Sequence, residues 1–96
     1  MEFVRIMKPI AEDWHKKAMH AIFSEDWEKA LFCCDKGLSI YRENSKLLIL
    51  KAVIDRKLGN FEVALNDLER ASRHMNFEGL VTEVNTQISL TYNEMG

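Results

Sequence analysis

The chain has 96 residues and a formal charge of −2, and 47% of its residues are hydrophobic. A chain of this composition can bury a modest core as one domain without disulfides or metal. Acidic and basic residues are interspersed and form no basic block, which argues against binding to nucleic acid or to an anionic membrane.

Several features bear on the compartment. The longest apolar run, residues 47–50, is too short to cross a bilayer. Residues 1–10 are interrupted by two basic side chains, and no small-residue cleavage site follows them, so they do not resemble a secretory signal. Cys33 and Cys34 are adjacent and would point about 100° apart on a helix, so we expect free thiols. We therefore predict a cytoplasmic protein.

The first two predicted helices span residues 10–23 and 27–41. Pro9 suits the first turn of the first helix, and apolar residues follow it at intervals of three and four. Asp26 can cap the second helix by accepting a backbone N–H.

Three more helices are predicted over residues 45–58, 61–75 and 80–95. Gly59 can adopt the left-handed conformation that ends a helix, and Asn60 can cap the helix that follows. The sequence thus predicts an all-α fold of about five helices, in which the fifth has no partner helix of its own.

The chain repeats itself at an offset of thirty-four residues. Residues 24–31 and 58–65 both contain an aromatic residue, an acid, any residue, alanine and leucine in that order. Superposing the two halves places small residues over small ones and large over large: Trp14 over Leu48, Ala18 over Ala52, Trp27 over Phe61, Ala30 over Ala64, Cys34 over Leu68 and Gly37 over Ala71. A fixed period of this length indicates a helical repeat protein.

This order of large and small residues resembles the tetratricopeptide repeat (TPR). The resemblance divides the chain into an N-terminal extension (1–10), a first repeat (11–44), a second repeat (45–78), and a capping helix or the start of a truncated third repeat (79–96). It implies a right-handed superhelix of antiparallel helix hairpins that binds other proteins as an adaptor or scaffold. Lys17 and Lys51 depart from the pattern of this family, in which leucine is typical at both positions.

In this family the first helix of each hairpin lines a concave groove that holds the partner. The resemblance places twelve residues of this chain in the groove: Glu12, His15, Lys16, Met19, Ile22, Phe23, Lys46, Ile49, Leu50, Val53, Arg56 and Lys57. The groove is apolar with a basic edge, so we expect a peptide or helix with apolar anchors and acidic neighbours. The residues with which some members grip the C-terminal carboxylate of chaperones are not matched here, so we expect no such carboxylate clamp.

Two alternatives concern the third helix, which is apolar on all sides. One is that residues 3–7 fold back and fill the groove. The other is self-association, in which two copies bury this helix against each other as a homodimer. Sedimentation of the purified chain separates self-association from binding to another protein.

No pattern of catalytic residues is evident. His15, His20 and His74 lack the spacing of a metal site, and no glycine-rich phosphate loop is present. The carboxylates are scattered beside lysines, so we expect no pair of them in an apolar pocket. Cys34 is expected in the core. We predict a protein that is not an enzyme and needs no metal or cofactor.

Overall fold

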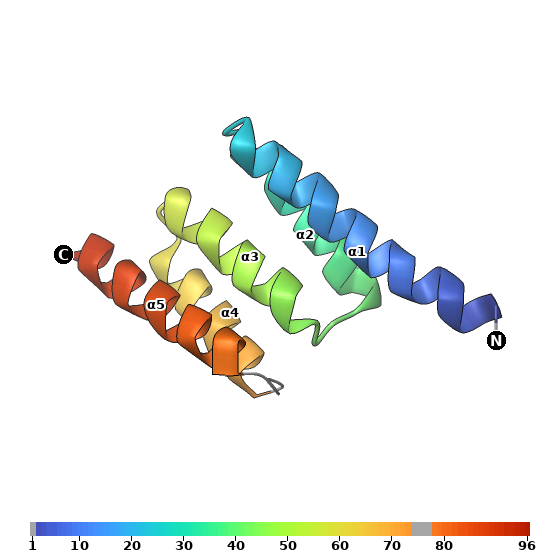
Figure 1. The fold of residues 1–96 in the computed structure, drawn as a ribbon. Helices are drawn as coiled ribbons and strands as arrows, with labels where there is room; N and C mark the ends of the chain where they lie inside the picture. The colour runs from blue at the N-terminus through green and yellow to red at the C-terminus, as the bar shows by residue number, and fades with distance from the viewer. Residues whose placement is uncertain (1, 74–77) are drawn as a thin grey trace.

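The computed structural model describes the backbone of residues 2–73 and 78–96 and the side chains of residues 11–73 and 81–96. This part of the chain contains five helices and no strand (Figure 1). They are α1 (Glu2–Phe23), α2 (Trp27–Ile40), α3 (Ser45–Lys57), α4 (Phe61–Ser72) and α5 (Glu78–Met95). The predicted all-α class with about five helices is confirmed; the predicted end of the fourth helix, at residues 74–75, lies outside the described residues.

The helices follow one another across the molecule in chain order (Figure 1). The hairpin of α1 and α2 forms one end, the hairpin of α3 and α4 lies in the middle, and α5 forms the other end. Helix α3 contacts all four other helices. This central place explains why its sequence is apolar on every side.

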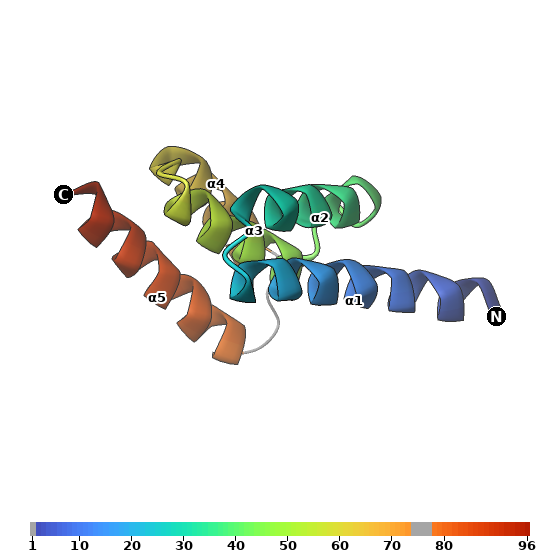
Figure 2. The ribbon, with the colours of Figure 1, turned by 90° about the horizontal axis from the view of Figure 1, so that it is seen from above.

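Helix α1 begins at Glu2, well before the start that we predicted near residue 10. Pro9 therefore lies inside the helix, where its missing N–H leaves the carbonyl four residues earlier without its usual donor. Residues 2–10 continue α1 past the end of α2 (Figure 2). They do not fold back onto α3, so the expectation that this segment fills the groove is wrong.

The turns inside the two hairpins have the same hydrogen bonds at an offset of thirty-four residues. In the first turn, the N–H of Glu25 donates to the carbonyl of Ile22 and that of Asp26 to the carbonyl of Ala21. In the second turn, Gly59 donates to Arg56 and Asn60 donates to Asp55. This pair of bonds is the Schellman motif, which requires a left-handed residue after the helix.

The left-handed residue differs between the two turns. Gly59 has φ +84°, as the sequence suggested, whereas the matching residue of the first turn is Glu25 with φ +57°. A side chain in this region is strained, and glycine is not. The two turns therefore have the same hydrogen bonds, but only the first turn has a strained left-handed residue.

Two helix N-caps make side-chain hydrogen bonds, one at the predicted Asp26 and one at Asn44. The Asp26 side chain accepts a bond from the N–H of Lys29 at 3.2 Å, and that of Asn44 accepts from Leu47 at 3.0 Å. Asn60 stands at the N-cap position of α4, but its side chain makes no capping bond, so that expectation is wrong.

Small residues lie where helices approach closely. Ala18 and Ala30 are fully buried in a cluster between α1, α2 and α3. Ala52 and Ala64 are buried in a second cluster, which Val84 of α5 completes. Close approach of two helices requires such small side chains opposite bulky ones. These clusters fix the spacing of the helices that carry the candidate site.

Candidate functional site

Helices α1, α3 and α5 form one face of the molecule. Helix α3 contacts both α1 and α5, whereas α1 and α5 make no contact with each other in the described part of the chain. Figure 2 shows α1 and α5 on one side, diverging from each other, with α2 and α4 on the opposite side. We call the face formed by α1, α3 and α5 the inner face.

Three of the predicted groove residues are buried by the chain itself. Ile49 is 6% exposed and belongs to the cluster that contains Val84 of α5. Leu50 is 8% exposed and packs with Ala18 of α1. Arg56 is also 8% exposed. These residues support the inner face from beneath and offer little surface to a partner.

Four apolar residues that the resemblance places in the groove are at least partly exposed on α1 and α3, and we call them the apolar strip: Met19, Ile22, Phe23 and Val53. The first two and Val53 are half-buried. Phe23, at the end of α1, is 79% exposed, the largest exposure among the large exposed hydrophobic residues that the structure describes. Exposed apolar side chains of this size favour contact with another molecule.

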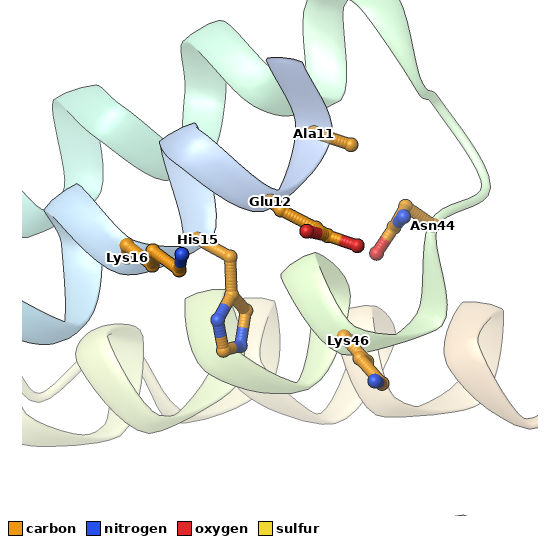
Figure 3. A pocket seen from close by; sticks show the side chains of 6 residues that line it. All are labelled: Ala11, Glu12, His15, Lys16, Asn44 and Lys46. Carbon is orange, nitrogen blue, oxygen red and sulfur yellow. The ribbon is translucent and has the colours of Figure 1, made fainter. Parts of the chain in front are cut away.

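A small polar cavity lies beside the apolar strip, between α1 and the start of α3. Its volume is about 200 Å³. Glu12 and Asn44 point toward one another across it, and His15 points toward α3 near Lys46 (Figure 3). Ala11 and Lys16 complete the lining. Ala11 and Asn44 were not predicted as site residues from the sequence, because their part in the cavity depends on how the two hairpins meet.

Burial lowers the pKa of His15, and the positive charge of Lys46 lowers it further. The imidazole is therefore neutral at pH 7 and can donate one hydrogen bond and accept another. The cavity thus combines two lysines, a neutral histidine and the carboxylate of Glu12.

Two of the residues that the resemblance places in the groove are lysines on α3. Lys46 and Lys57 are exposed, and neither forms an ion pair with any residue that the structure describes. They stand at opposite ends of α3. A ligand along the inner face would therefore meet positive charge at both ends of α3.

Arg56 joins α3 to α5 at the far edge of this face. Its guanidinium donates to Glu94 at 2.8 Å and to Gln87 at 3.3 Å, while its Nε has no partner in the structure. The resemblance placed Arg56 in the groove but gave no indication of these contacts, because the alignment of the fifth helix against the repeat was ambiguous. The residue therefore positions α5 as a wall of the inner face.

A second polar cluster contradicts an expectation from the sequence. We expected no paired carboxylates in an apolar pocket, but Asp55 and Asp67 are each 2% exposed and both bind Lys51. The Lys51 Nζ lies 2.8 Å from Asp55 and 3.1 Å from Asp67. The signal in the sequence was Lys51 itself, a lysine at a position where leucine is typical, with an acid one helical turn later.

The cluster has perturbed proton affinities. Burial raises the pKa of Asp67 to about 7, and its hydrogen bond with Asp55 acts in the same direction. Burial by itself would lower the pKa of Lys51, but its bonds to Asp55 and Asp67 outweigh burial and raise the pKa. Both carboxylates are closed to solvent, which suits a structural role between the helices rather than work on a substrate.

Cys33 and Cys34 are free and buried. Burial raises the pKa of the Cys34 thiol to about 12, with the nearby Asp35 adding to the effect. A thiol that keeps its proton is a poor nucleophile. Cys34 therefore contributes to the first core cluster, as the sequence predicted.

The described residues include no helix with the length and apolarity needed to cross a membrane. Among the same residues, no three histidine, cysteine or acidic side chains are grouped closely enough to hold a metal ion; His74 lies outside them. No protein-family model matches the chain, and searches of curated proteins and of solved structures found no match either.

Proposed function

We propose that the chain is a TPR-like superhelix that acts as a non-catalytic adaptor or scaffold segment and binds another protein on its inner face. The repeat architecture is supported by the thirty-four-residue period and by the Schellman bonds that recur at the same offset. Free, buried thiols suit a reducing compartment such as the cytoplasm.

One observation carries the binding function. The inner face joins the apolar strip, with Phe23 79% exposed, to Lys46 and Lys57, for which the described residues provide no ion pair. A single ligand could bury the apolar strip and pair with these lysines. The ligand that fits is an amphipathic peptide or helix of another protein, with apolar anchors and acidic neighbours.

Self-association through α3 is the competing function. Most apolar residues of α3 are already buried by the other helices, including Leu47, Leu48 and Ile54 at 0% exposure. Apart from the half-buried Val53, this helix leaves little apolar surface for a second copy. The structure thus weakens the reason for expecting self-association through α3.

Selection of binding peptides from a displayed random library tests the proposal. The chain is the target, and each selected peptide is then titrated against a Val53→Glu variant. We expect the peptides to share an apolar anchor beside acidic residues and to lose affinity for this variant, since a glutamate at Val53 places charge on the apolar strip.

The chain offers a matched control for this variant. Val63 lies on α4, on the opposite side of the molecule, and is 45% exposed. Val63→Glu should leave peptide binding unchanged, and both variants should keep a helical circular dichroism spectrum. Loss of binding in both variants, or in neither, would place the ligand elsewhere and contradict the proposal. Concentration-dependent sedimentation that only Val53→Glu abolishes would favour self-association.

A further inference from the structure

The first hairpin holds a second surface, which shares only Lys16 with the polar cavity between α1 and α3. A cavity of about 600 Å³ is lined only by residues of α1 and α2. Four of these are basic: Lys16, Lys17, His20 and Lys29. The others are Trp14, Phe32 and Cys33, and no acidic residue lines the cavity. We call this surface the basic end, because α1 and α2 form one end of the molecule (Figure 1).

Phe32 of the basic end is exposed, Trp14 is half-buried, and a lysine lies over the ring of each. Phe32 is 56% exposed, and the Lys36 Nζ lies 5.4 Å from the centre of its ring. The Lys17 Nζ lies 4.7 Å from the centre of the Trp14 ring. In the part of the chain that the structure describes, Lys16, Lys17 and Lys29 form no ion pair.

The internal repeat indicates what this surface lacks. Lys17 corresponds to Lys51, which binds Asp55 and Asp67 in the second hairpin. The residues of the first hairpin that correspond to these two acids are Ala21 and Cys33. Lys17 therefore has no carboxylate where its counterpart has two, and it rests on an aromatic ring instead.

The second hairpin also has a helix at the corresponding place. Helix α2 packs against α3. Burial raises the pKa of Asp35 on α2, and the nearby charge of Lys51 opposes this rise, so Asp35 lies close to Lys51. Helix α2 thus brings an acid close to the lysine of the next hairpin and packs Leu38 against the core cluster of that hairpin. No described helix does this for the first hairpin.

We propose that the basic end binds an acidic amphipathic helix of a partner protein, which packs against α1 and α2 as α2 packs against α3. Charge complementarity selects this occupant, because the cavity has four basic side chains, two aromatic rings and no acid. The helix would place its apolar residues on Phe32 and Trp14 and its acids beside Lys17 and Lys29. This partner is additional to the ligand of the inner face.

A pair of synthetic peptides tests this inference. Each has about 18 residues, enough for a stable helix, with leucines along one face. One carries glutamate beside the leucines, and the other carries glutamine at the same places. Titration of each labelled peptide with the full chain, followed by fluorescence anisotropy, gives the affinity and the stoichiometry.

The inner face is proposed to bind a ligand of the same class, so the titration is also run on the Val53→Glu variant, in which that site is weakened. There we expect one acidic peptide per chain and at least about tenfold weaker binding of the glutamine peptide. Lys17→Glu with Lys29→Glu should weaken the acidic peptide at least about tenfold, and Phe32→Ala should also weaken it. These side chains are exposed, so the variants should fold. Control variants on the inner face, Lys46→Glu and Val53→Glu, should leave this affinity unchanged.

Several results would overturn the inference. Equal binding of the two peptides would show that charge does not select the ligand. Weakening by Lys46→Glu but not by Lys29→Glu would assign the peptide to the inner face, leaving the proposed function intact. Tighter binding of a single-stranded oligonucleotide than of the acidic peptide would assign the basic end to nucleic acid. Concentration-dependent sedimentation abolished by Lys29→Glu would assign it to a second copy.

Discussion

Lys51 on α3 reaches Asp67 on α4 at 3.1 Å and holds it beside Asp55 in the interior of the molecule. The three groups carry one positive charge and two ionisable carboxyls. Desolvation of two neighbouring carboxylates favours keeping a proton on one of them. The cluster should therefore make the stability of the fold depend on pH.

Asp67→Asn should remove much of this dependence. The pKa of Asp67 rises from 3.8 to about 7 on folding, so the folded chain binds more protons than the unfolded chain between these values. Stability contributed by the protonated group is present below about pH 4 and is lost as the pH rises to about 7. Asparagine keeps the shape and can donate to Asp55 without ionising.

Urea unfolding of the wild type and of Asp67→Asn at a series of pH values checks this prediction. The free energy of unfolding of the variant minus that of the wild type should increase by about 1 to 3 kcal/mol between acid and neutral pH. Asp35 and His15 also have shifted pKa values, but both titrate in the two proteins. Parallel profiles would contradict the assignment to Asp67.

Glu25→Gly should stabilise the protein, although it removes a side chain. Glu25 has φ +57°, in the left-handed region that costs a side-chain-bearing residue roughly 1 to 2 kcal/mol. Part of this gain is offset by the greater freedom of glycine in the unfolded chain, so we expect about 0.5 to 1 kcal/mol. Thermal and urea unfolding measure the change.

Gly59→Ala is the matching control in the second turn. Gly59 has φ +84°, and no atom lies within 4 Å of the position that an added Cβ would take, so only backbone strain opposes alanine there. We expect a loss of about 1 kcal/mol. A gain in stability from Gly59→Ala together with a loss from Glu25→Gly would contradict the shared turn geometry.

Gly37→Ala should destabilise the protein, contrary to the usual effect inside a helix. Alanine normally stabilises a helix interior relative to glycine by about 0.5 to 1 kcal/mol. An added Cβ at Gly37 would lie 3.0 Å from the Cβ of Trp14 and 2.8 Å from a methyl group of Leu47. The resulting overpacking should cost about 1 to 3 kcal/mol and outweigh the helical preference.

The corresponding residue of the second hairpin is Ala71, which is fully buried. Ala71→Gly should lose stability for the ordinary reason of helix preference, so both substitutions are expected to destabilise. Chemical denaturation measures both. If Gly37→Ala proved more stable than the wild type, the close approach of α1 and α2 at Trp14 would be wrong.

His15 should report an acidic ligand through its pKa. In the free chain the pKa lies below the ordinary 6.5, because the imidazole is partly buried and faces Lys46. A carboxylate entering the polar cavity favours the protonated imidazole, so the pKa should rise and the affinity should increase as the pH falls through 6.5. NMR titration of the His15 ring with and without a selected peptide measures the shift.

Much of the fold could be predicted from the pattern of residue sizes. The boundaries of α2 and α3 and the start of α4 follow from Asp26, from apolar spacing and from Gly59, which act locally. The predicted end of the fourth helix, near residue 75, was too late, since α4 ends at Ser72. The start of α1 could not be predicted in this way, because Pro9 is as compatible with a first turn as with a helix interior that tolerates one lost bond.

The candidate site was harder to predict from the sequence than the fold was. Met19, Ile22, Phe23 and Val53 reach the surface, but periodicity alone could not distinguish them from Ile49 and Leu50, which neighbouring helices bury. Likewise, the sequence alone does not distinguish Asp67 from an acid on the surface, because its burial depends on its contact with Lys51 of α3. In both cases the missing information was which helix covers which side of α3.

Chemical-shift mapping tests the central claim, binding of a protein ligand on the inner face, most directly. The isotope-labelled full chain is titrated with the tightest peptide from the displayed library. We predict that the largest shifts follow the apolar strip on α1 and α3, extend to Lys46 and reach α5 near Glu94. Shifts confined to α2 and α4, with the inner face unchanged, would contradict the claim.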